Sequence, residues 1–368
     1  MKILHVSKFY PPYRGGLEQV VYDLVTGLQN SFTKVDVLAV NDDSKTESEV
    51  SDKGTVYRAA KLFEFASVAF SFSFLLIWRQ IRVNYDVVHV HLPNPLANLV
   101  MFLFRPRSKL VIHWHSDIVK QKWLLKIYLP LMTWLLKRAD KIIVTSESYL
   151  RHSEQLANYV NKCHLIPIGI ESIECDVNED LVTEIRSNTS GKLVVFSLGR
   201  HVYYKGFEYL IEAAKECENT IFLIGGIGPD TKNYKKLIAH YNIEHKIKLL
   251  GKIPDEELAS YFKAADVFCF PSIEKSEAFG VVQLESMSVG TPIISCDIKG
   301  SGVPWVNKHQ SSGLVVQVKD SLALAKALES FKTDELVRSL GIGAKKRFNE
   351  LFTKSKMVDK TFNLYEEL

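Results

Sequence analysis

Cysteine is scarce in this sequence, and no two cysteines have metal-binding or redox spacing. The 368 residues contain five cysteines, an odd number, and no C-x-x-C motif. A disulfide framework and a structural zinc site are therefore not expected, and a reducing cytoplasm is the expected environment. The cysteines are Cys163, Cys175, Cys217, Cys269 and Cys296.

The sequence also has little that resembles a leader or a membrane-spanning run. Residues 1–6 enter a strand-like segment directly, without the basic, apolar and small residues of a signal peptide. The most apolar stretch, residues 62–78, includes Glu64 and is shorter than the roughly 20 apolar residues that a spanning helix needs. We therefore expect a protein that is not secreted, with a buried helix over 62–78.

Two common nucleotide-binding motifs are absent. The sequence has no G-x4-G-K-[ST] motif, which argues against a P-loop. The glycine cluster at residues 225–231 has Thr231 where the third glycine of G-x-G-x-x-G would stand. A nicotinamide cofactor is therefore disfavoured.

The first half of the chain has a net positive charge and the second half a net negative one. Residues 1–170 carry 21 Lys and Arg against 14 Asp and Glu, whereas residues 171–368 carry 25 against 28. A basic half suits an anionic partner such as a phosphate-bearing ligand or a membrane surface, although scattered solvated side chains explain the same numbers.

The segment Lys120–Lys141 has the composition of a helix that rests on a lipid interface. It mixes Trp123, Tyr128 and Trp134 with several basic residues, and an ordinary packing helix is the alternative. Pro130 is expected to kink or divide this helix.

Short β-branched runs alternate with helical stretches along the whole chain, which predicts βαβ units and parallel sheets. Each half begins with a strand, a glycine loop and a helix, so we expect two doubly wound α/β domains with a boundary near residues 167–176. The predicted strands are 2–7, 34–40, 86–91, 108–113, 141–145, 164–167, 192–197, 220–224, 247–250, 267–271, 292–296 and 313–316. The main predicted helices are 16–30, 124–139, 207–216, 255–264 and 281–289.

Two glycine loops open helices and favour phosphate. Gly15 and Gly16 follow the first strand, and their missing Cβ atoms allow backbone N–H groups to approach an anion. The second loop, Gly199–Gly206, contains Arg200, a planar fork for phosphate oxygens, and Lys205, a compact charge near a helix N-terminus.

A pair of carboxylates and a strand-end histidine complete the candidate residues. Glu277 is expected in a loop and Glu285 within the following helix. Glu277 can then contact a ligand at the N-terminus of that helix, and Glu285 can contact a pair of ligand hydroxyls further along it. His115 ends a strand and is suited to bond a sugar or acceptor hydroxyl. A metal at His113 and His115 is disfavoured because no third ligand cluster is evident, and the alternating His89 and His91 are interpreted as structural.

Together these motifs resemble glycosyltransferase family 4, the retaining, nucleotide-sugar-dependent enzymes with the GT-B fold. The resemblance rests on Gly15-Gly16, His115, the Gly199–Gly206 loop, the Glu277-x7-Glu285 pair and the Gly290–Ile294 run, and it extends from Met1 to Leu368. Residues 115–123 and 300–307 are similar to bacterial surface-polysaccharide mannosyltransferases.

The resemblance implies four catalytic residues. Arg200 and Lys205 match the pair that holds the donor diphosphate, in place of the divalent metal of other transferases. Glu277 matches the acidic residue near the 3-hydroxyl of the donor sugar, and His115 matches the histidine near that sugar.

The remaining implied contacts bind the donor. Gly15, Gly16 and Gly199 belong to the loops beside the donor phosphates, and Glu285 matches the residue that bonds the ribose. The backbone of Phe279, Gly280 and Val281 would contact sugar and phosphate, while Lys252 and Ile253 fall where the base lies. One departure is that Pro304 and Trp305 stand where the family commonly has an acidic residue.

The implied domains are an acceptor-side domain (1–168), a nucleotide-sugar domain (169–353) and a C-terminal helix (354–368) that crosses back. The implied activity is retaining transfer of a hexose, with mannose from GDP-mannose as the best guess and a UDP-hexose as the alternative, in O-antigen or capsule synthesis. No metal or other cofactor and no nucleic acid is expected. The acceptor is expected to be a polyprenyl-diphosphate-linked oligosaccharide, reached by an enzyme that is peripheral on the inner face of the cytoplasmic membrane.

Three other kinds of protein compete with this interpretation. A GT-B sugar-nucleotide epimerase or a phosphorylase would share the fold, and the epimerase would convert the donor without an acceptor. A catalytically inactive sugar-nucleotide-binding protein would be expected to have lost motif residues that this chain retains. A periplasmic-type binding protein would require an export signal.

Overall fold

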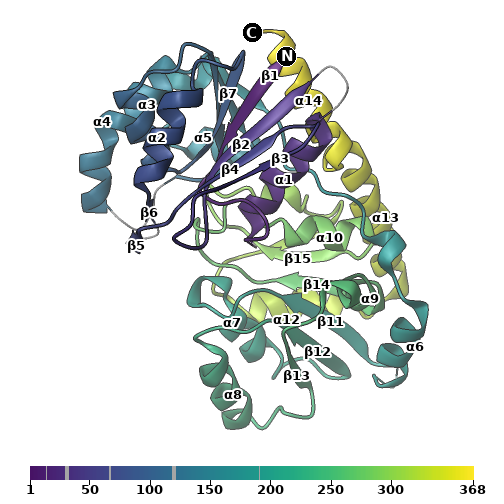
Figure 1. Ribbon diagram of the computed structural model, residues 1–368. Helices are drawn as coiled ribbons and strands as arrows, with labels where there is room; N and C mark the ends of the chain where they lie inside the picture. The colour runs from purple at the N-terminus through teal and green to yellow at the C-terminus, as the bar shows by residue number, and fades with distance from the viewer. Residues whose placement is uncertain (14, 30–32, 66–67, 118–121, 190) are drawn as a thin grey trace. The chain divides into compact units, whose positions relative to one another are not determined.

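The computed structural model describes residues 1–13, 15–29, 33–65, 68–117, 122–189 and 191–368 (Figure 1). The chain forms two compact units, one made of Met1–Gly169 with Lys354–Leu368 and the other of Ile170–Thr353. Each unit is built on a parallel or largely parallel sheet with flanking helices, the doubly wound arrangement that the sequence pattern predicts.

The N-terminal unit has an eight-stranded sheet with strand order β10-β9-β8-β7-β1-β2-β4-β3. All neighbouring strands run parallel except the β3–β4 pair. The strands are β1 (Lys2–Val6), β2 (Lys34–Val40), β3 (Glu47–Val50), β4 (Thr55–Ala59), β7 (Val87–Leu92), β8 (Lys109–Trp114), β9 (Lys141–Val144) and β10 (Cys163–Leu165). The helices are α1 (Gly16–Leu28), α2 (Phe72–Ile81), α3 (Pro95–Leu103), α4 (Lys122–Arg138), α5 (Glu147–His152), the 3-10 turn η1 (Ala157–Lys162) and α14 (Lys354–Glu366).

The C-terminal unit has a six-stranded, fully parallel sheet with strand order β13-β12-β11-β14-β15-β16. The strands are β11 (Leu193–Leu198), β12 (Thr220–Gly225), β13 (Ile247–Gly251), β14 (Val267–Phe270), β15 (Ile293–Cys296) and β16 (Gly313–Val316). The α-helices are α6 (Glu179–Ser187), α7 (Phe207–Ala213), α8 (Thr231–His240), α9 (Leu258–Ala264), α10 (Val282–Ser288), α11 (Val303–Val306), α12 (Ser321–Ser330) and α13 (Asp334–Leu351). The 3-10 turns are η2 (Glu174–Asp176), η3 (Tyr203–Lys205) and η4 (Asp255–Glu257).

Every predicted strand is present within two residues of its expected ends. Parallel strands covered by helices on both faces read as nearly continuous apolar runs, which makes them easy to recognise. The β3–β4 hairpin was not predicted, because all four residues of β3 are exposed and show no apolar alternation.

The predicted buried helix over residues 62–78 is confirmed for 72–78, which lie in α2 with Phe74 and Trp78 buried, and wrong for the residues before them. The chain instead forms a small antiparallel hairpin, β5 (Phe63–Phe65) and β6 (Val68–Phe70), before α2 begins. Aromatic residues at alternate positions suit a hairpin, and the Phe63 and Phe70 rings stack across it with centroids 4.6 Å apart. The Ser71 hydroxyl accepts a hydrogen bond from the Phe74 backbone N–H and so caps α2. Within the described residues, no helix is both long and apolar enough to cross a bilayer.

Helix α4 is continuous through Pro130, so the expected division at that residue is wrong. Packing against α3 offsets the loss of one backbone hydrogen bond. Tyr128 is buried and bonded to the side chain of Asn98, and the Trp134 ring meets that of Phe102 edge to face at 5.3 Å. These contacts are those of a packing helix. The first two residues of the predicted interfacial segment, Lys120 and Gln121, lie outside the described residues.

Candidate active-site residues

The candidate residues of the C-terminal unit follow the carboxyl ends of four neighbouring strands. The Gly199–Gly206 loop follows β11, the Gly225–Gly228 cluster ends β12, Lys252 and Ile253 follow β13, and the segment that contains Glu277 follows β14. In a doubly wound sheet these ends form one edge, which is where ligands bind.

At this edge Lys205 and Glu277 form an ion pair. The Lys205 Nζ lies 2.5 Å from Glu277 Oε2, and each side chain is 14% exposed. The same ammonium lies 4.9 Å from the centroid of the Phe270 ring, while the Ser272 hydroxyl donates to Glu277 Oε2 at 3.4 Å. The sequence analysis did not single out Phe270 or Ser272, and no spacing pattern identifies them.

Arg200 stands beside this pair in sequence but has a different environment. Its side chain is exposed, and among the described residues its guanidinium has no hydrogen bond or ion pair. The loop then turns through Gly206, whose φ of 67° is left-handed and whose α-hydrogen faces the Pro271 carbonyl. A side chain at this position would collide with that backbone, so the turn requires glycine.

The Gly225–Gly228 cluster has a packing role. A Cβ on Gly226 would meet the carbonyl of Gly199, and one on Gly228 would meet the backbone of His201. The His201 N–H donates to the Ile227 carbonyl at 3.1 Å, which ties the two loops together. These glycines therefore allow the β11 and β12 loops to approach closely.

Glu285 lies in the first turn of α10, as predicted, and Glu277 lies in the loop before it. Burial, followed by the nearby charge of Asp255, raises the pKa of the Glu285 carboxyl to about 7. Among the described residues no side chain or backbone group bonds this carboxylate. It is thus an acceptor available to a ligand.

The turn into α10 contains Phe279, Gly280 and Val281. Gly280 has a φ of 74°, and a Cβ there would press on the Phe270 ring. The Phe279 side chain is buried, so only its backbone is available to a ligand, while Val281 is half-buried at the helix start.

Ser301 and Gly302 hold the loop that contains Glu277 through hydrogen bonds to its backbone. The Ser301 hydroxyl donates to the Glu277 carbonyl at 2.5 Å, and the Gly302 N–H donates to the Ala278 carbonyl at 2.7 Å. Trp305 stands in the segment where the family commonly has an acidic residue. Its ring packs edge to face on the Phe352 ring, with centroids 5.7 Å apart, and lies under the Arg347 guanidinium.

Lys252 and Ile253 differ in exposure. Lys252 is exposed, whereas Ile253 is buried with its side chain over Gly225. The preceding Gly251 has a φ of 72°, which turns the chain away from β13.

The candidate residues of the N-terminal unit also lie at carboxyl ends of strands. Gly15 precedes α1 as its N-cap, and the Glu18 side chain folds back over it. Gly16 is the first residue of α1, and a Cβ there would have no neighbour within 4 Å. The space beside Gly16 is therefore open among the described residues.

His115 directly follows β8 and is almost fully buried. Its Nε2 lies 2.9 Å from Nδ1 of His91, on the adjacent strand β7. Burial lowers the pKa of His115 to about 3, so the ring is neutral at physiological pH. His113 and His115 do have a third possible ligand, contrary to the expectation from sequence, because ring nitrogens of His91 and of these two residues lie within 4.8 Å of one another. A second group of the same kind is formed by His5, His89 and His91.

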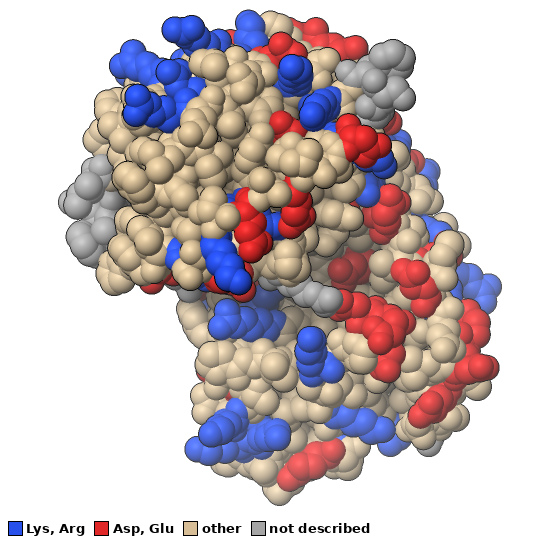
Figure 2. Space-filling model, in the orientation of Figure 1, with Lys and Arg blue, Asp and Glu red and all other residues tan. Residues whose placement is uncertain are grey.

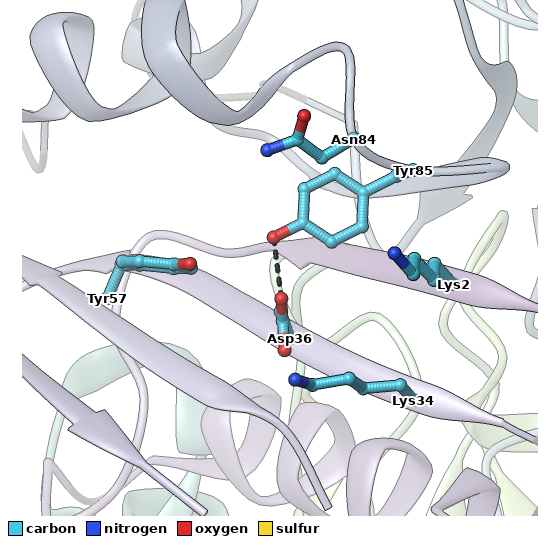
Figure 3. A pocket seen from close by; sticks show the side chains of 6 residues that line it. All are labelled: Lys2, Lys34, Asp36, Tyr57, Asn84 and Tyr85. Carbon is cyan, nitrogen blue, oxygen red and sulfur yellow. Dashed lines mark hydrogen bonds between the residues drawn. The ribbon is translucent and has the colours of Figure 1, made fainter.

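A separate cavity opens at the opposite, amino-terminal edge of the N-terminal sheet (Figure 3). Its lining includes Lys2, Lys34 and Asp36, from the first residues of β1 and β2, and Tyr85. Tyr85 donates its hydroxyl to Asp36 Oδ2 at 2.7 Å, and the Thr55 N–H donates to Oδ1 at 2.7 Å. Because its carboxylate is already satisfied and it lies away from the carboxyl ends, this cavity is not the candidate active site.

Comparison with known proteins identifies relatives over the full length of the chain. The model of Glycosyltransferase Family 4 matches residues 14–172, and that of Glycosyl transferases group 1 matches residues 182–347. The O-antigen chain mannosyltransferase C of Escherichia coli is 33% identical over 100% of this chain and 99% of its own. The D-rhamnosyltransferase WbpZ of Pseudomonas aeruginosa is 30% identical over 96% of this chain and 92% of its own.

Solved structures show the same fold at lower identity. Anabaena Alr3699/HepE in complex with UDP matches with a TM-score of 0.79 and 19% identity, over 100% of both chains. A sucrose-phosphate synthase from Thermosynechococcus elongatus matches with a TM-score of 0.78 and 23% identity, over 100% of this chain and 98% of its own. The expected GT-B fold is thus confirmed, and with relatives that match along its whole length the chain belongs to glycosyltransferase family 4.

Proposed function

We propose that this glycosyltransferase moves mannose from GDP-mannose, with retention of configuration, onto a lipid-linked oligosaccharide of a bacterial surface polysaccharide, O-antigen or capsule. The observation that carries the proposal is the Lys205–Glu277 ion pair at the carboxyl edge of the C-terminal sheet, with the unpaired Arg200 in the same loop. Similarity to an O-antigen mannosyltransferase along the whole chain supports the sugar and the process.

The charges of this edge suit a departing nucleoside diphosphate. When the bond between the sugar and the diphosphate breaks, negative charge grows on the leaving oxygens. The Arg200 guanidinium, held by no other described group, is free to bond them as a fork, and the Lys205 ammonium has three donors, of which Glu277 takes one. Fixed cations at the site of developing charge lower the barrier without a metal ion, so we expect turnover to persist in the presence of a chelator.

The two glutamates would orient the donor. The Glu277 carboxylate, held near Lys205 and Ser272, would accept a hydrogen bond from the sugar near its 3-hydroxyl. The unpartnered Glu285 carboxylate would accept the ribose hydroxyls. Backbone groups at Gly199 and at residues 279–281 would contact phosphate and sugar, with the base near Lys252 and Ile253.

Retention is proposed to follow from same-face attack. The acceptor hydroxyl would approach the anomeric carbon on the side from which the diphosphate leaves, and a leaving-group oxygen would take the hydroxyl proton. The neutral His115 would bond the sugar, and Gly15 and Gly16 would border the donor phosphates.

We also propose contact with the inner face of the cytoplasmic membrane through the β5–β6 hairpin and the start of α2. Five large apolar side chains there are 43–65% exposed: Leu62, Phe63, Phe65, Phe72 and Leu76. Side chains of this kind on a basic half of the chain suit an anionic lipid surface. Lys and Arg side chains gather toward the top of the N-terminal unit in Figure 2, away from β5 and β6 at its lower left in Figure 1, so the proposed contact rests on the apolar side chains.

A thermal-shift panel of GDP, UDP, ADP and TDP tests the donor. A nucleotide present at 100 times its Kd stabilises the native state by about 2.7 kcal/mol, so the correct base stands out. GDP is expected to give the largest shift. The largest shift with UDP would favour a UDP-hexose, and no shift with any nucleotide would contradict a donor site.

Incubation of GDP-mannose without acceptor tests the epimerase alternative. The transferase returns the donor intact or slowly hydrolysed, whereas an epimerase releases a converted nucleotide sugar that chromatography separates.

A further inference from the structure

Five histidines share one face of the N-terminal sheet. His5 lies on β1, His89 and His91 on β7, and His113 on β8, with His115 directly after it. Within the sheet His5 pairs with His89 and His91 pairs with His113, and alternate residues of a strand point to the same face. His115 is 8% exposed, and the other four are at most 1% exposed.

Three of these rings form a hydrogen-bonded chain that begins at the last helix. The Tyr365 hydroxyl of α14 lies 3.4 Å from His5 Nε2, His5 Nδ1 lies 3.0 Å from His91 Nε2, and His91 Nδ1 lies 2.9 Å from His115 Nε2. The same hydroxyl bonds Nδ1 of His89. Each of the two middle rings thus uses both of its nitrogens.

The direction of one bond in this chain sets the direction of all the others. Burial lowers the pKa of His5 and His115 to about 3 and that of His91 well below its usual value, so all three rings are neutral. A neutral imidazole donates from one nitrogen and accepts at the other. If the single proton of the Tyr365 hydroxyl is donated to His5, the hydroxyl accepts from His89 Nδ1 and every ring of the chain donates toward His115, whose Nδ1 then carries the proton. If His5 donates to Tyr365, the reverse holds, and His115 Nδ1 is a bare acceptor.

We propose that Tyr365 is a positioning residue that, through His5 and His91, holds His115 in one tautomer. The nitrogen of His115 outside the chain then has a fixed role, donor or acceptor, toward a substrate hydroxyl. The significance for catalysis rests on the role proposed above for His115, but the tautomer itself is a property of the free protein. The C-terminal helix thereby acts on a candidate catalytic ring from which it is separated by more than 200 residues of sequence.

The same histidines offer ligands to a metal ion, but the chain explains their arrangement better. The nitrogens of His91 that would bind the ion already face hydrogen-bonding partners at 2.9 and 3.0 Å. All the possible ligands are neutral, and a divalent cation enclosed among them would lack a compensating charge in a fully buried place.

His113 provides a matched control. Its ring stacks on His115 with centroids 4.1 Å apart, but among the described residues neither of its nitrogens has a partner. A His113→Phe variant keeps an aromatic ring in the stack and leaves every bond of the chain in place. A metal held by His91, His113 and His115 would depend on His113, whereas the chain does not.

Nitrogen NMR of protein labelled with [15N]histidine tests the proposal without substrate, because the Nδ1 and Nε2 shifts of an imidazole report its tautomer. The His115 signals are assigned by their loss in His115→Gln. In the wild-type protein they are expected to report a single tautomer, and His113→Phe is expected to leave them unchanged. Tyr365→Phe and His5→Phe, each checked for a native circular-dichroism spectrum, are expected to shift them toward a mixture. If only one tautomer is competent and the two become equally populated, kcat falls about two-fold while the donor KM is unchanged.

Three results would overturn the proposal. The first is an unchanged His115 tautomer in both Tyr365→Phe and His5→Phe. The second is a mixture of His115 tautomers in His113→Phe as well, which would mean that any disturbance of the ring stack mixes the tautomers. The third is a stoichiometric metal in the purified wild-type protein, whether or not it is lost in His113→Phe, because both histidine groups that could hold an ion include His91 of the chain. A failed nucleotide panel would leave these readouts intact, so the failure of the proposed function and that of the tautomer proposal are distinguishable.

Discussion

The ammonium of Lys205 lies 2.5 Å from the carboxylate of Glu277, and both side chains are mostly shielded from water, whereas Arg200 in the same loop is exposed and unpaired among the described residues. The two cations proposed to hold one diphosphate therefore differ in what they do for the folded protein.

Arg200→Ala and Lys205→Met are expected to separate activity from stability. Arg200→Ala lowers kcat about 10²–10³-fold with an unchanged Tm, because the lost charge served only the leaving group. Lys205→Met lowers activity as strongly and also costs ~1–3 kcal/mol of stability, because Glu277 loses its partner in a largely buried place. Enzyme assays and thermal denaturation of the same preparations measure both effects.

The double variant Lys205→Met/Glu277→Leu is the control. It leaves no unpaired charge, so its Tm is expected to recover toward the wild-type value while its activity stays low. Full activity in Arg200→Ala would refute the proposal that Arg200 binds the leaving diphosphate.

Glu285→Gln is expected to stabilise the ligand-free protein increasingly as pH rises above 4.5, with the full effect above about pH 7. The pKa of Glu285 is raised from 4.5 to about 7, so between these values the folded chain retains a proton that the unfolded chain has lost. Stability from this group therefore falls as pH rises through the window. The variant should match the wild-type Tm at pH 4 and exceed it by a few °C at pH 8, as thermal scans at both values will show.

The same substitution should weaken nucleotide binding. At pH 8 the ionised carboxylate accepts strong hydrogen bonds, and its replacement by an amide is expected to raise the nucleoside diphosphate Kd about ten-fold. Calorimetry at pH 6 and pH 8 separates this contribution from titration of the phosphate itself, which both proteins share. Equal affinities at pH 8 would exclude Glu285 from the site.

Gly16→Ala and Gly206→Ala should have opposite effects on stability. A methyl group at Gly16 meets no atom within 4 Å, so the substitution is expected to keep or slightly raise the Tm while the donor KM increases through crowding of the phosphates. At Gly206 the φ of 67° and the Pro271 carbonyl oppose any side chain, and a loss of ~1–3 kcal/mol is expected. An unaltered KM in Gly16→Ala would place the donor elsewhere.

Serine substitutions in the β5–β6 hairpin should weaken lipid binding. Phe63, Phe65 and Phe72 are each more than half exposed, and their combined replacement is expected to reduce sedimentation with phosphatidylglycerol vesicles about ten-fold or more. Leu322→Ser/Ile342→Ser, which removes equally exposed apolar side chains from the C-terminal unit, is the matched control. Equal losses in both variants would contradict a specific lipid contact.

Local sequence determined much of the fold. Apolar runs such as Leu193–Leu198 specify parallel strands because both faces of the sheet are covered, and a glycine loop after the strand specifies the turn into a helix. The helix predicted before residue 72 is wrong because high apolar content there suggested burial, whereas the alternating Phe63 and Phe65 lie in a hairpin with their side chains exposed. Composition alone does not distinguish these outcomes.

By itself, the sequence determined the family and the alternation of strands and helices. It also determined which types of residue are available to bind a diphosphate. Each of these depends on neighbours along the chain. Only the tertiary structure decided that Lys205 pairs with Glu277, that Glu285 remains unpartnered among the described residues, and that Tyr365 meets histidines of two strands, His5 of β1 and His89 of β7. Those relationships depend on strand order and on the return of the last helix to the first sheet. Burial then raises the pKa of Glu285 and lowers those of His5, His91 and His115.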